Sequence, residues 1–507
     1  MSKKILSFDL GTGGNKATLY DADGTCLASA FVEYGTSYPG VGMYEQKPED
    51  WRRAVVESAR KLLAETKADP KEIACCALSG HSLGCVPLDA DGELLREQTP
   101  IWSDVRATEQ AERFFERIDP TAWYRRTGCG FSPEHYTAFK ILWYRDHEPE
   151  MFARTRKIVG TKDYVNYYLT GRIVTDPGYA SGCGVWNLPG WDYSPEFMSG
   201  AGLDRELFPD VVPSAEPIGT LTERAAEDMG LSRDTLVICG SVDNSCMALG
   251  AGAFKRGRSY ASMGSSTWIA VSDDRLDLDP AVRPYVFAHC VPGFYAIALA
   301  LYSSGTTLRW VKDAMCSDLV ERAAREGRNV YELAIEEAAT SAPGANGVLM
   351  NPSLAGGASQ DGSPKLRGGF LGLDLAHTRA DVLRAALEGV ALGLRNVREC
   401  LFAKGGAGDS TVVVGGGAIS SVWRQIYADV MKTAIVKTNV GQNAAALGAA
   451  ALAAVGAGLW PGFDKVDELV RQGERTEPNP ALAELYDRKY DDYLYARELL
   501  TRFAERR

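Results

Sequence analysis

The sequence places an aspartate directly before a glycine-rich run, in Asp9-Leu-Gly-Thr-Gly-Gly. Glycine-rich loops that follow a strand can turn backbone N–H groups toward an anion such as a phosphate. A carboxylate beside a phosphate repels it unless a cation stands between them, and Mg²⁺ is the cation that this pairing indicates. Asp9 is therefore a candidate metal-associated residue; the alternative is a solvated aspartate at the end of a strand.

A second aspartate, Asp243, lies in the glycine-bounded stretch Gly-Ser-Val-Asp-Asn-Ser, with Asn244 directly after it. A carboxylate in such a loop can act as the general base that takes a proton from an attacking hydroxyl during phosphoryl transfer. Asn244 would then hold a neighbouring hydroxyl. Aspartate is also a common helix N-cap, so a purely structural explanation stays open at this point.

Three loops rich in Gly, Ser or Thr each follow a strand-like run, at residues 11–14, 264–266 and 415–417. The common phosphate-binding sequence G-x-x-x-x-G-K-[ST] is absent from the chain. One such loop is a weak signal, whereas three in the same context favour a bound nucleotide.

The run Gly-His-Ser-Leu-Gly at residues 80–84 fits G-x-S-x-G, the nucleophile elbow of serine hydrolases. That elbow requires a strand, a sharp turn and then a helix. Here Pro87 follows closely and residues 89–92 form a turn, so the pattern predicts strand, loop, strand. Ser82 is therefore not expected to be a nucleophile.

Several elements must position these loops. Strand-like runs flank the first loop, an amphipathic helix with Trp51, Val55 and Leu62 on one face is expected over Pro48–Thr66, and a strand over 73–78. The sequence of residues 257–274 repeats the order of elements expected at the N-terminus: strand, Gly-Ser loop, strand, acidic turn. This echo predicts two domains of similar topology. The Ala- and Gly-rich run 444–460 is predicted to be a buried helix.

Bulk properties narrow the class of protein. A chain of 507 residues is too long for a single hydrophobic core, so two large domains are expected. Its 66 acidic and 55 basic residues give a net charge of −11. An acidic chain disfavours nucleic acid and anionic membranes as partners. Eleven cysteines without C-x-x-C spacing fit free thiols in a reducing cytoplasm. The expected location is therefore cytoplasmic.

With these loops identified, the chain resembles the FGGY family of carbohydrate kinases, with xylulokinases and their relatives as the nearest group. The resemblance runs from residue 4 to about residue 458. It rests on the order and spacing of several segments: DLGTGGNKA, IWSDVRA, YTAFKILWYRDHEP, GTKDYVNYYLTGRIVTDPGYAS, GSVDNSCMALGAG, ALYSSGTTLRWVKD, GGGAISSVWRQIYADV and AAALGAAALAAVGAG.

The resemblance implies an α/β fold of the actin/Hsp70/sugar-kinase type: two RNase H-like domains, expected at 1–252 and 253–507, with the active site in the cleft between them. It implies ATP-dependent phosphorylation of a sugar hydroxyl with Mg²⁺. Asp243 then matches the catalytic base and Asp9 the Mg²⁺-associated acid. The implied ATP contacts are Thr12, Gly13, Gly264, Ser265, Gly305, Gly417 and Ser421. The implied sugar contacts are His81, Ser82, Leu83, Trp102, Asp104, Asp243 and Asn244.

The chain departs from the family pattern at the sugar loop. Xylulokinases have Gly-Gln-Met-His-Gly where this chain has Gly-His-Ser-Leu-Gly, so Ser82 and Leu83 replace Met and His. The segment 354–369 also lacks the Glu and Arg of the usual Gly-Glu-Arg-Thr-Pro. A few such contacts decide selectivity. A ketose such as xylulose or another pentulose is the first expectation, and a different polyol, deoxysugar or modified ketose is the alternative.

Further expectations concern single residues, the alternative function and the assembly. His81 is as consistent with a packed loop residue as with a pocket residue, and Asp104 and Arg106 could pair only with each other. A nucleotide-binding regulator of the same fold is a less favoured function, because a pure binding module has no use for a base at Asp243. A homodimer is one expected assembly.

Overall fold

The computed structural model describes residues 3–276, 278–403 and 408–506. By its internal contacts the chain forms two compact units. Unit 1 comprises Met1–Arg256, Ser272–Ala296 and Asn443–Val470, and unit 2 comprises Gly257–Val271, Ile297–Gln442 and Arg471–Arg507. The boundary expected after residue 252 stays a prediction, and the contact-based unit 1 also includes two later segments, Ser272–Ala296 and Asn443–Val470.

Unit 1 is built on a six-stranded sheet in the order β13-β14-β5-β1-β2-β3. The strands β1, β2 and β3 form an antiparallel meander, and β5 and β14 run parallel to β1. Parallel strands buried on both faces read as continuous apolar runs, as Ile-Ala-Cys-Cys-Ala-Leu of β5 does. The strand bounds are β1 Lys4–Gly11, β2 Gly14–Asp21, β3 Cys26–Glu33, β5 Ile73–Gly80, β13 Pro217–Thr220 and β14 Leu236–Val242.

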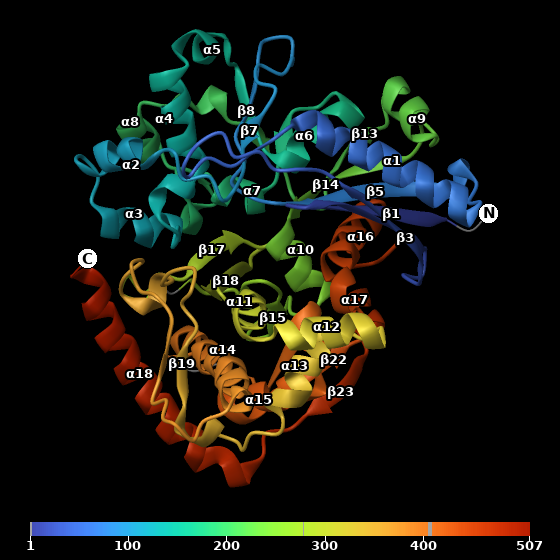
Figure 1. Cartoon of the computed structure of the whole chain (residues 1–507). Coiled ribbons are helices and arrows are strands. Elements are labelled where there is room, and N and C mark those ends of the chain that lie inside the picture. The colour runs from blue at the N-terminus through green and yellow to red at the C-terminus, as the bar shows by residue number, and fades with distance from the viewer. Residues whose placement is uncertain (1–2, 277, 404–407, 507) are drawn as a thin grey trace. The chain divides into compact units, whose positions relative to one another are not determined.

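Helices cover both faces of this sheet. α1 (Pro48–Thr66) has the bounds predicted from its pattern and buries Trp51, Val55 and Leu62. In the view of Figure 1, α1 lies above the sheet and α16 (Ala444–Gly456) lies below it. The predicted burial of the alanine-rich run is confirmed, since α16 contacts β1, β5 and β14.

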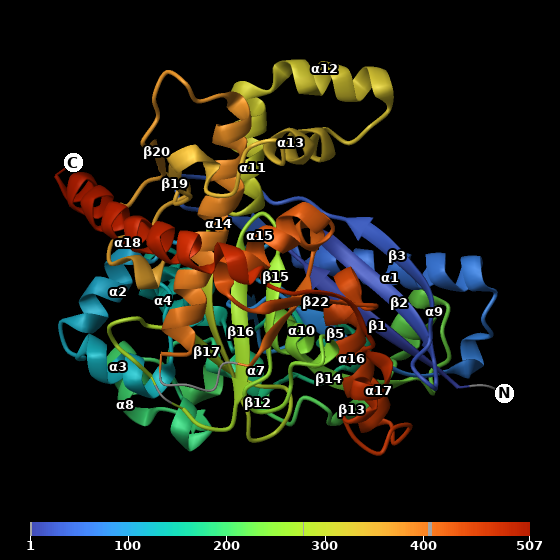
Figure 2. The ribbon, with the colours of Figure 1, turned by 90° about the horizontal axis from the view of Figure 1, so that it is seen from below.

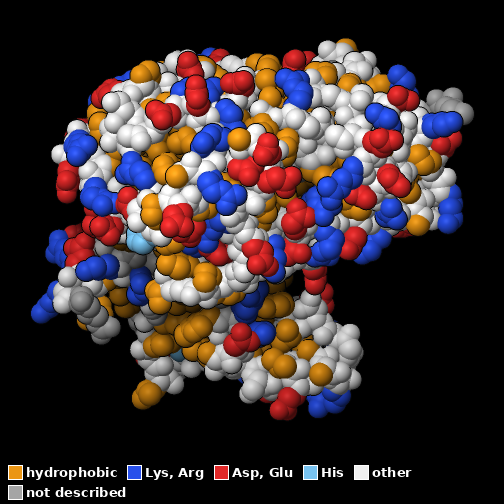
Figure 3. Space-filling view, turned by 90° about the horizontal axis from the view of Figure 1, so that it is seen from above, with side chains coloured by type: hydrophobic (Ala, Val, Ile, Leu, Met, Phe, Trp, Pro, Cys, Tyr) orange, Lys and Arg blue, Asp and Glu red, His pale blue; other side chains and the backbone are white. Residues whose placement is uncertain are grey.

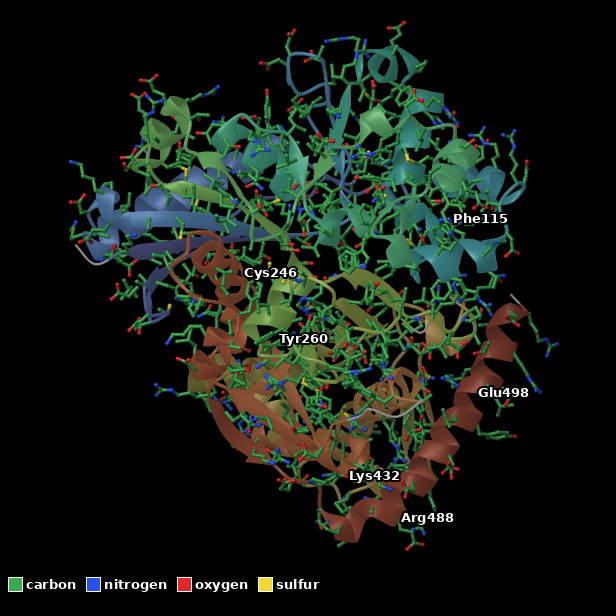
Figure 4. All side chains as sticks on the ribbon, turned by 180° about the vertical axis from the view of Figure 1, so that it is seen from behind. Phe115, Cys246, Tyr260, Lys432, Arg488 and Glu498 are labelled. Carbon is green, nitrogen blue, oxygen red and sulfur yellow. The ribbon has the colours of Figure 1, made fainter. Side chains whose placement is uncertain are left out.

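α16 packs closely on α10 (Asp243–Gly250), the helix that carries Asp243. A Cβ atom on Gly250 would lie 1.8 Å from the carbonyl oxygen of Ala444, and one on Gly448 would lie 1.9 Å from that of Cys246. Only glycine permits this approach of two backbones. Cys246 is labelled on α10 in Figure 4, one turn beyond Asp243.

Unit 2 repeats the strand order of unit 1. Six strands of a seven-stranded sheet lie in the order β18-β16-β15-β21-β22-β23, with β17 beyond β18. The neighbouring strands β15 and β16 are side by side in Figure 2. As in unit 1, an antiparallel hairpin is followed by two parallel strands and an antiparallel edge. The echo seen in the sequence is thus a repeat of topology. The bounds are β15 Ser259–Met263, β16 Thr267–Asp273, β18 Tyr295–Leu301, β21 Ser410–Val414, β22 Ala434–Thr438 and β23 Gln472–Thr476.

The remaining helices are α2 Thr108–Phe115, α3 Pro120–Thr127, α4 Thr137–His147, α5 Pro149–Arg154, α6 Thr161–Thr170, α7 Pro177–Ser181, α8 Pro195–Ala201, α9 Glu223–Met229, α11 Gly305–Met315, α12 Ser317–Glu326, α13 Val330–Ala338, α14 Arg379–Leu401, α15 Ser421–Met431, α17 Lys465–Leu469 and α18 Ala483–Glu505. The remaining strands are β4 Glu45–Gln46, β6 Val86–Leu88, β7 Thr99–Pro100, β8 Lys157–Val159, β9 Val174–Thr175, β10 Trp186–Asn187, β11 Asp192–Tyr193, β12 Asp210–Val211, β17 Tyr285–Ala288, β19 Leu349–Asn351 and β20 Gly369–Leu371.

The distribution of charge and the state of the cysteines agree with the composition. Acidic and basic side chains are interspersed over the face shown in Figure 3. All eleven cysteines are free thiols. Within the part of the chain that the structure describes, no helix is long and apolar enough to span a membrane.

Candidate active site

Three strand ends meet at one edge of the unit 1 sheet and bring predicted residues together. Asp9 of β1 pairs with Ser79 of β5, and Ser79 pairs with Ser241 of β14. The residues that follow these strands, including Asp243, therefore lie at the same edge. Carboxyl ends of parallel strands are where α/β sheets commonly bind ligands.

The loop between β1 and β2 is a tight hairpin whose tip is Thr12 and Gly13, both exposed. The Gln46 side chain donates to the Thr12 carbonyl at 2.7 Å, and the Trp102 indole N–H donates to the Thr12 hydroxyl at 3.0 Å. No atom lies within 4 Å of a Cβ built on Gly13, so the tip is open to a ligand.

Asp9 lies near the end of β1, where the Ser79 hydroxyl donates to its carboxylate at 3.0 Å. Burial raises the Asp9 pKa, while the Ser79 bond and the charge of Lys16 oppose that rise. Lys16 faces Asp9 across the β1–β2 hairpin.

Asp243 is the first residue of α10, directly after β14 ends at Val242. It is not the N-cap, so the structural explanation left open by the sequence is not what is observed. The Asn244 backbone N–H donates to its carboxylate at 2.7 Å. Burial, and then the negative charge of Asp9, raise the Asp243 pKa to about 7.

The Gly-His-Ser-Leu-Gly segment forms a loop between β5 and β6, as predicted, with no helix after it. The geometry of a nucleophile elbow is therefore absent. Ser82 is partly exposed. Leu83 is buried with φ of 61°, a left-handed conformation that costs a non-glycine residue about 1 to 3 kcal/mol.

His81 points into unit 1 and is only 1% exposed. Its ring lies edge-on to Trp51, and its Nδ1 lies 3.1 Å from the Thr161 hydroxyl. Burial, and then the charge of Lys140, lower the His81 pKa to about 4, so the ring is neutral at physiological pH. The structure thus places His81 as a packed loop residue.

The side chains of Trp102 and Asp104, which belong to the same loop, point in different directions. Trp102 is 38% exposed beside Thr12, as a ligand contact would be. The Asp104 carboxylate is fully buried and accepts from the Tyr44 backbone N–H at 2.7 Å and from the Arg106 guanidinium at 2.7 Å. Arg106 also contacts Glu45 at 2.8 Å. Asp104 and Arg106 therefore pair as the sequence suggested, but not only with each other.

A buried charged network, the Lys162 network, supports this edge of the sheet; its members Lys162, Asp163 and Asp176 lie in the quoted segment GTKDYVNYYLTGRIVTDPGYAS, for which no role in the site was predicted. The Lys162 ammonium lies 2.5 Å from Asp163 and 3.1 Å from Asp176, all at most 1% exposed. The Ser214 and Ser241 hydroxyls donate to Asp176 at 2.9 and 2.5 Å. Burial alone would lower the Lys162 pKa, but the two carboxylates raise it well above its ordinary value.

The Lys162 network touches two strand ends. A Cβ atom on Gly80 would lie 3.0 Å from the Lys162 Cβ, so the start of the sugar loop rests directly on this side chain. Ser241 stands two residues before Asp243. The sequence signal was the segment GTKDYVNYYLTGRIVTDPGYAS, which resembles the family but does not show that Lys162 and Asp176 meet in the fold.

In unit 2 the predicted nucleotide residues gather at the end of β15. Gly264 and Ser265 form the exposed turn between β15 and β16. The backbone N–H groups of Gly305 and Thr306 donate to the carbonyls of Gly264 and Ser265 at 3.0 and 3.1 Å. A Cβ atom on Gly305 would lie 2.6 Å from the Gly264 carbonyl oxygen, which explains the glycine.

The third glycine loop reaches the same strand end. A Cβ atom on Gly417 would lie 3.0 Å from that of Met263, the last residue of β15. Ser421 opens α15, where Ser420 is the N-cap that accepts from the Trp423 backbone N–H. At this end of β15 the predicted nucleotide residues therefore offer mainly backbone groups and glycines.

A metal ion would find few protein ligands. Among the described residues no group of three or more His, Cys, Asp or Glu side chains is arranged to hold one. Mg²⁺ in nucleotide sites is commonly held by one or two carboxylates together with phosphates. Asp9, near the end of β1, is the carboxylate that the sequence predicts for such an ion.

Comparisons with known proteins agree with this geometry. Residues 4–250 match the N-terminal domain, and residues 259–457 the C-terminal domain, of the FGGY family of carbohydrate kinases. The chain is 30% identical to the xylulose kinase of Bacillus subtilis, over 97% of this chain and 96% of that protein. It is 29% identical to the gluconokinase of the same organism, over 94% and 92%.

The solved structure of xylulose kinase from Rhodospirillum rubrum has the same fold. The TM-score is 0.89 at 29% identity, covering 99% of this chain and 100% of that one. Neighbours of this kind have the two-domain, actin/Hsp70-like architecture, which confirms the fold class expected from the sequence. The chain belongs to the FGGY family of carbohydrate kinases and is an ATP-dependent enzyme that phosphorylates a carbohydrate.

Proposed function

We propose that this kinase phosphorylates a hydroxyl of a small ketose, with xylulose or another pentulose as the first candidate. The observation that carries the proposal is the Asp243 carboxylate at the start of α10, whose pKa is raised to about 7. A general base works best when its pKa lies near the working pH. The curated relatives named xylulose kinase support the ketose.

The proposed reaction assigns a proton acceptor to unit 1. The Asp243 carboxylate takes the proton of the sugar hydroxyl as that oxygen forms its bond to the γ-phosphorus of ATP. The bond from that phosphorus to the bridging oxygen breaks, and ADP leaves with the electron pair. Asn244 holds a neighbouring hydroxyl. Ser82 and Trp102 contribute to the wall of the sugar site, and the buried Leu83 supports it from behind.

The nucleotide contacts are proposed mainly for unit 2. The turn at Gly264 and Ser265, with Gly305, Gly417 and Ser421, offers backbone N–H groups and hydroxyls to ATP. Thr12 and Gly13 in unit 1 are proposed to contact the phosphates. Asp9 would hold Mg²⁺ together with those phosphates, and the ion would neutralise their charge.

His81 and Asp104 are not proposed as direct sugar contacts. Their buried polar groups already have partners in unit 1, so they support the loops that carry Ser82 and Trp102. We propose that they act on substrate binding indirectly, through these loops.

Gluconate is the second candidate substrate. Gluconokinases are nearly as similar to this chain as xylulose kinases are, at 28 to 29% identity. The replacement of Met-His by Ser82-Leu83 in the sugar loop also changes the chemistry offered to the sugar. Another polyol or deoxysugar remains the broader alternative.

The test is ADP release from MgATP with xylulose, gluconate and a panel of other ketoses and polyols. We expect one sugar to stimulate turnover, and Asp243→Asn to lower kcat about 10³-fold because the hydroxyl loses its base. Asp234→Asn, an exposed aspartate of the same unit, is the matched control and should keep full activity. Sugar-independent ADP release, unchanged in Asp243→Asn, would contradict the proposal and favour a nucleotide-binding regulator.

A further inference from the structure

One face of α4 binds the backbone of the sugar loop. Thr137, Lys140 and Tyr144 lie three and four residues apart, so they share one side of the helix. Their side chains donate to the carbonyls of three consecutive residues, 84, 83 and 85, at 3.1, 3.0 and 2.9 Å respectively. We call these three side chains the carbonyl-binding face.

Lys140 is the member of this face that reaches a second loop. Its ammonium also donates to the Ile101 carbonyl at 2.7 Å. Ile101 directly precedes Trp102, and Leu83 directly follows Ser82. A single buried side chain thus joins the two loops that carry Ser82 and Trp102.

The partners of Lys140 are unusual for a buried cation. Lys140 is fully buried. Among the described residues, no carboxylate lies within 4.0 Å of its ammonium. A buried charge is costly unless it is paired or well hydrogen-bonded. Two neutral carbonyls compensate that cost only in part, which indicates that the charge has a purpose other than stability.

We propose that Lys140 is a positioning residue: by holding the Leu83 and Ile101 carbonyls together, its ammonium sets the distance between the Ser82 and Trp102 sides of the sugar site and thereby the affinity for sugar. The inference rests on the proposed function. Leu83, held in a left-handed conformation, would relax if this contact were lost.

The Lys140 ammonium can lose its proton at mildly alkaline pH. Burial lowers the Lys140 pKa to about 8, and the negative charge of Asp104 opposes that shift. The pKa values of His81 and His135 are lowered to about 4, and that of Cys85 is raised to about 12. The charged and titratable groups that face Lys140 are His81, Cys85, Asp104, Arg106 and His135.

Loss of the Lys140 proton converts two charge-assisted hydrogen bonds into neutral ones, which are about half as strong. The sugar site should then loosen as the pH rises through 8. A purely structural lysine would not make substrate affinity depend on pH in this way.

The experiment measures kcat and KM for sugar and for ATP between pH 7.5 and 9.5, with xylulose and gluconate as the probes. In the wild type we expect the KM for sugar to rise several-fold across this range while the KM for ATP stays constant. In Lys140→Met the KM for sugar should be raised about 10- to 100-fold at every pH, because small displacements of substrate contacts cost that much. Its pH dependence should be absent.

Tyr144→Phe is the matched control from the same face. It removes the donor to the Cys85 carbonyl and leaves Lys140 and Ile101 untouched, so the pH dependence of the KM for sugar should remain. If Lys140→Met does not fold, the wild-type profile alone decides.

A KM for sugar that is constant from pH 7.5 to 9.5 in the wild type, or unchanged in Lys140→Met, overturns the role of Lys140 and leaves the proposed function intact. A wild type that phosphorylates no sugar overturns both. The two failures are therefore distinguishable.

Discussion

Two fully buried lysines stand beneath the same loop of unit 1 and differ in what faces them. Lys162 lies under Gly80, at the start of the loop, with two carboxylates within 3.1 Å. Lys140 lies under Leu83, further along, with two backbone carbonyls. The Lys162 pKa is raised well above its ordinary value, and the Lys140 pKa is lowered to about 8.

The difference shows that partners rather than burial decide the behaviour of a buried lysine. Burial lowers the pKa of both side chains, and only the carboxylates of the Lys162 network reverse its effect. Lys162 is therefore a permanent charge that fixes one end of the loop. Lys140 is a charge that can be lost, and its end of the loop can respond to pH.

Removing Lys162 should have the largest effect on folding. Lys162→Met leaves Asp163 and Asp176 buried without their cation, and we expect the free energy of unfolding to fall by about 3 to 5 kcal/mol. Urea unfolding at pH 7.5 measures it. Combining the change with Asp163→Asn and Asp176→Asn should restore part of the loss, and a single variant as stable as the wild type would remove the distinction between the two lysines.

The second-largest expected difference between the two lysines is in how the free energy of unfolding depends on pH. The Lys140 pKa in the folded state lies below that of an unfolded lysine, so between about pH 8 and 10 the unfolded chain binds more protons. The free energy of unfolding of the wild type, relative to Lys140→Met, should therefore rise by about 2 kcal/mol from pH 7.5 to 9.5. Urea unfolding at both pH values measures this difference, and a constant difference would contradict the lowered pKa.

For Lys162 the sign is opposite. Its folded-state pKa is raised, so its contribution is present throughout this range and is lost only as the pH rises through that raised value. The wild type relative to Lys162→Met should thus show no gain between pH 7.5 and 9.5. This variant is the control for the preceding measurement.

The smallest effect is expected at the edge of the Lys162 network. Ser241→Ala removes one donor to Asp176, which keeps Lys162 and Ser214 as partners, so we expect a loss of about 1 kcal/mol in the free energy of unfolding. Ser241 precedes Asp243 by two residues, so kcat should fall modestly as well. Thr235→Val, which removes a buried hydroxyl bond to the Ile73 carbonyl at the opposite end of β14, is the control for stability without an effect on kcat.

Much of the fold could be predicted because its signals are local. The bounds of α1 follow from its apolar spacing, and Pro87 predicts the strand–loop–strand course around Ser82. The repeated hairpin of the two units was visible because both carry a glycine loop between strands. The glycines of unit 2 came together at β15 as their context indicated.

The buried polar contacts could not be predicted, because their partners are distant in the sequence. Asp104 is held by the Tyr44 backbone, and Lys162 meets Asp176 and the hydroxyls of Ser214 and Ser241. No local sequence pattern tells whether the side chain of a loop residue such as His81 points into the interior or toward solvent. The expected direct contacts of His81 and Asp104 with sugar therefore stay predictions that the burial of both side chains disfavours.

The return of α16 to the unit 1 sheet has a consequence for how the protein is made. A ribosome has joined about 450 residues before this helix exists, yet β1, β5 and β14 are all complete by residue 242. Until then one apolar side of that sheet lacks its covering helix. Exposed apolar surface of this kind is prone to aggregation until the helix is in place.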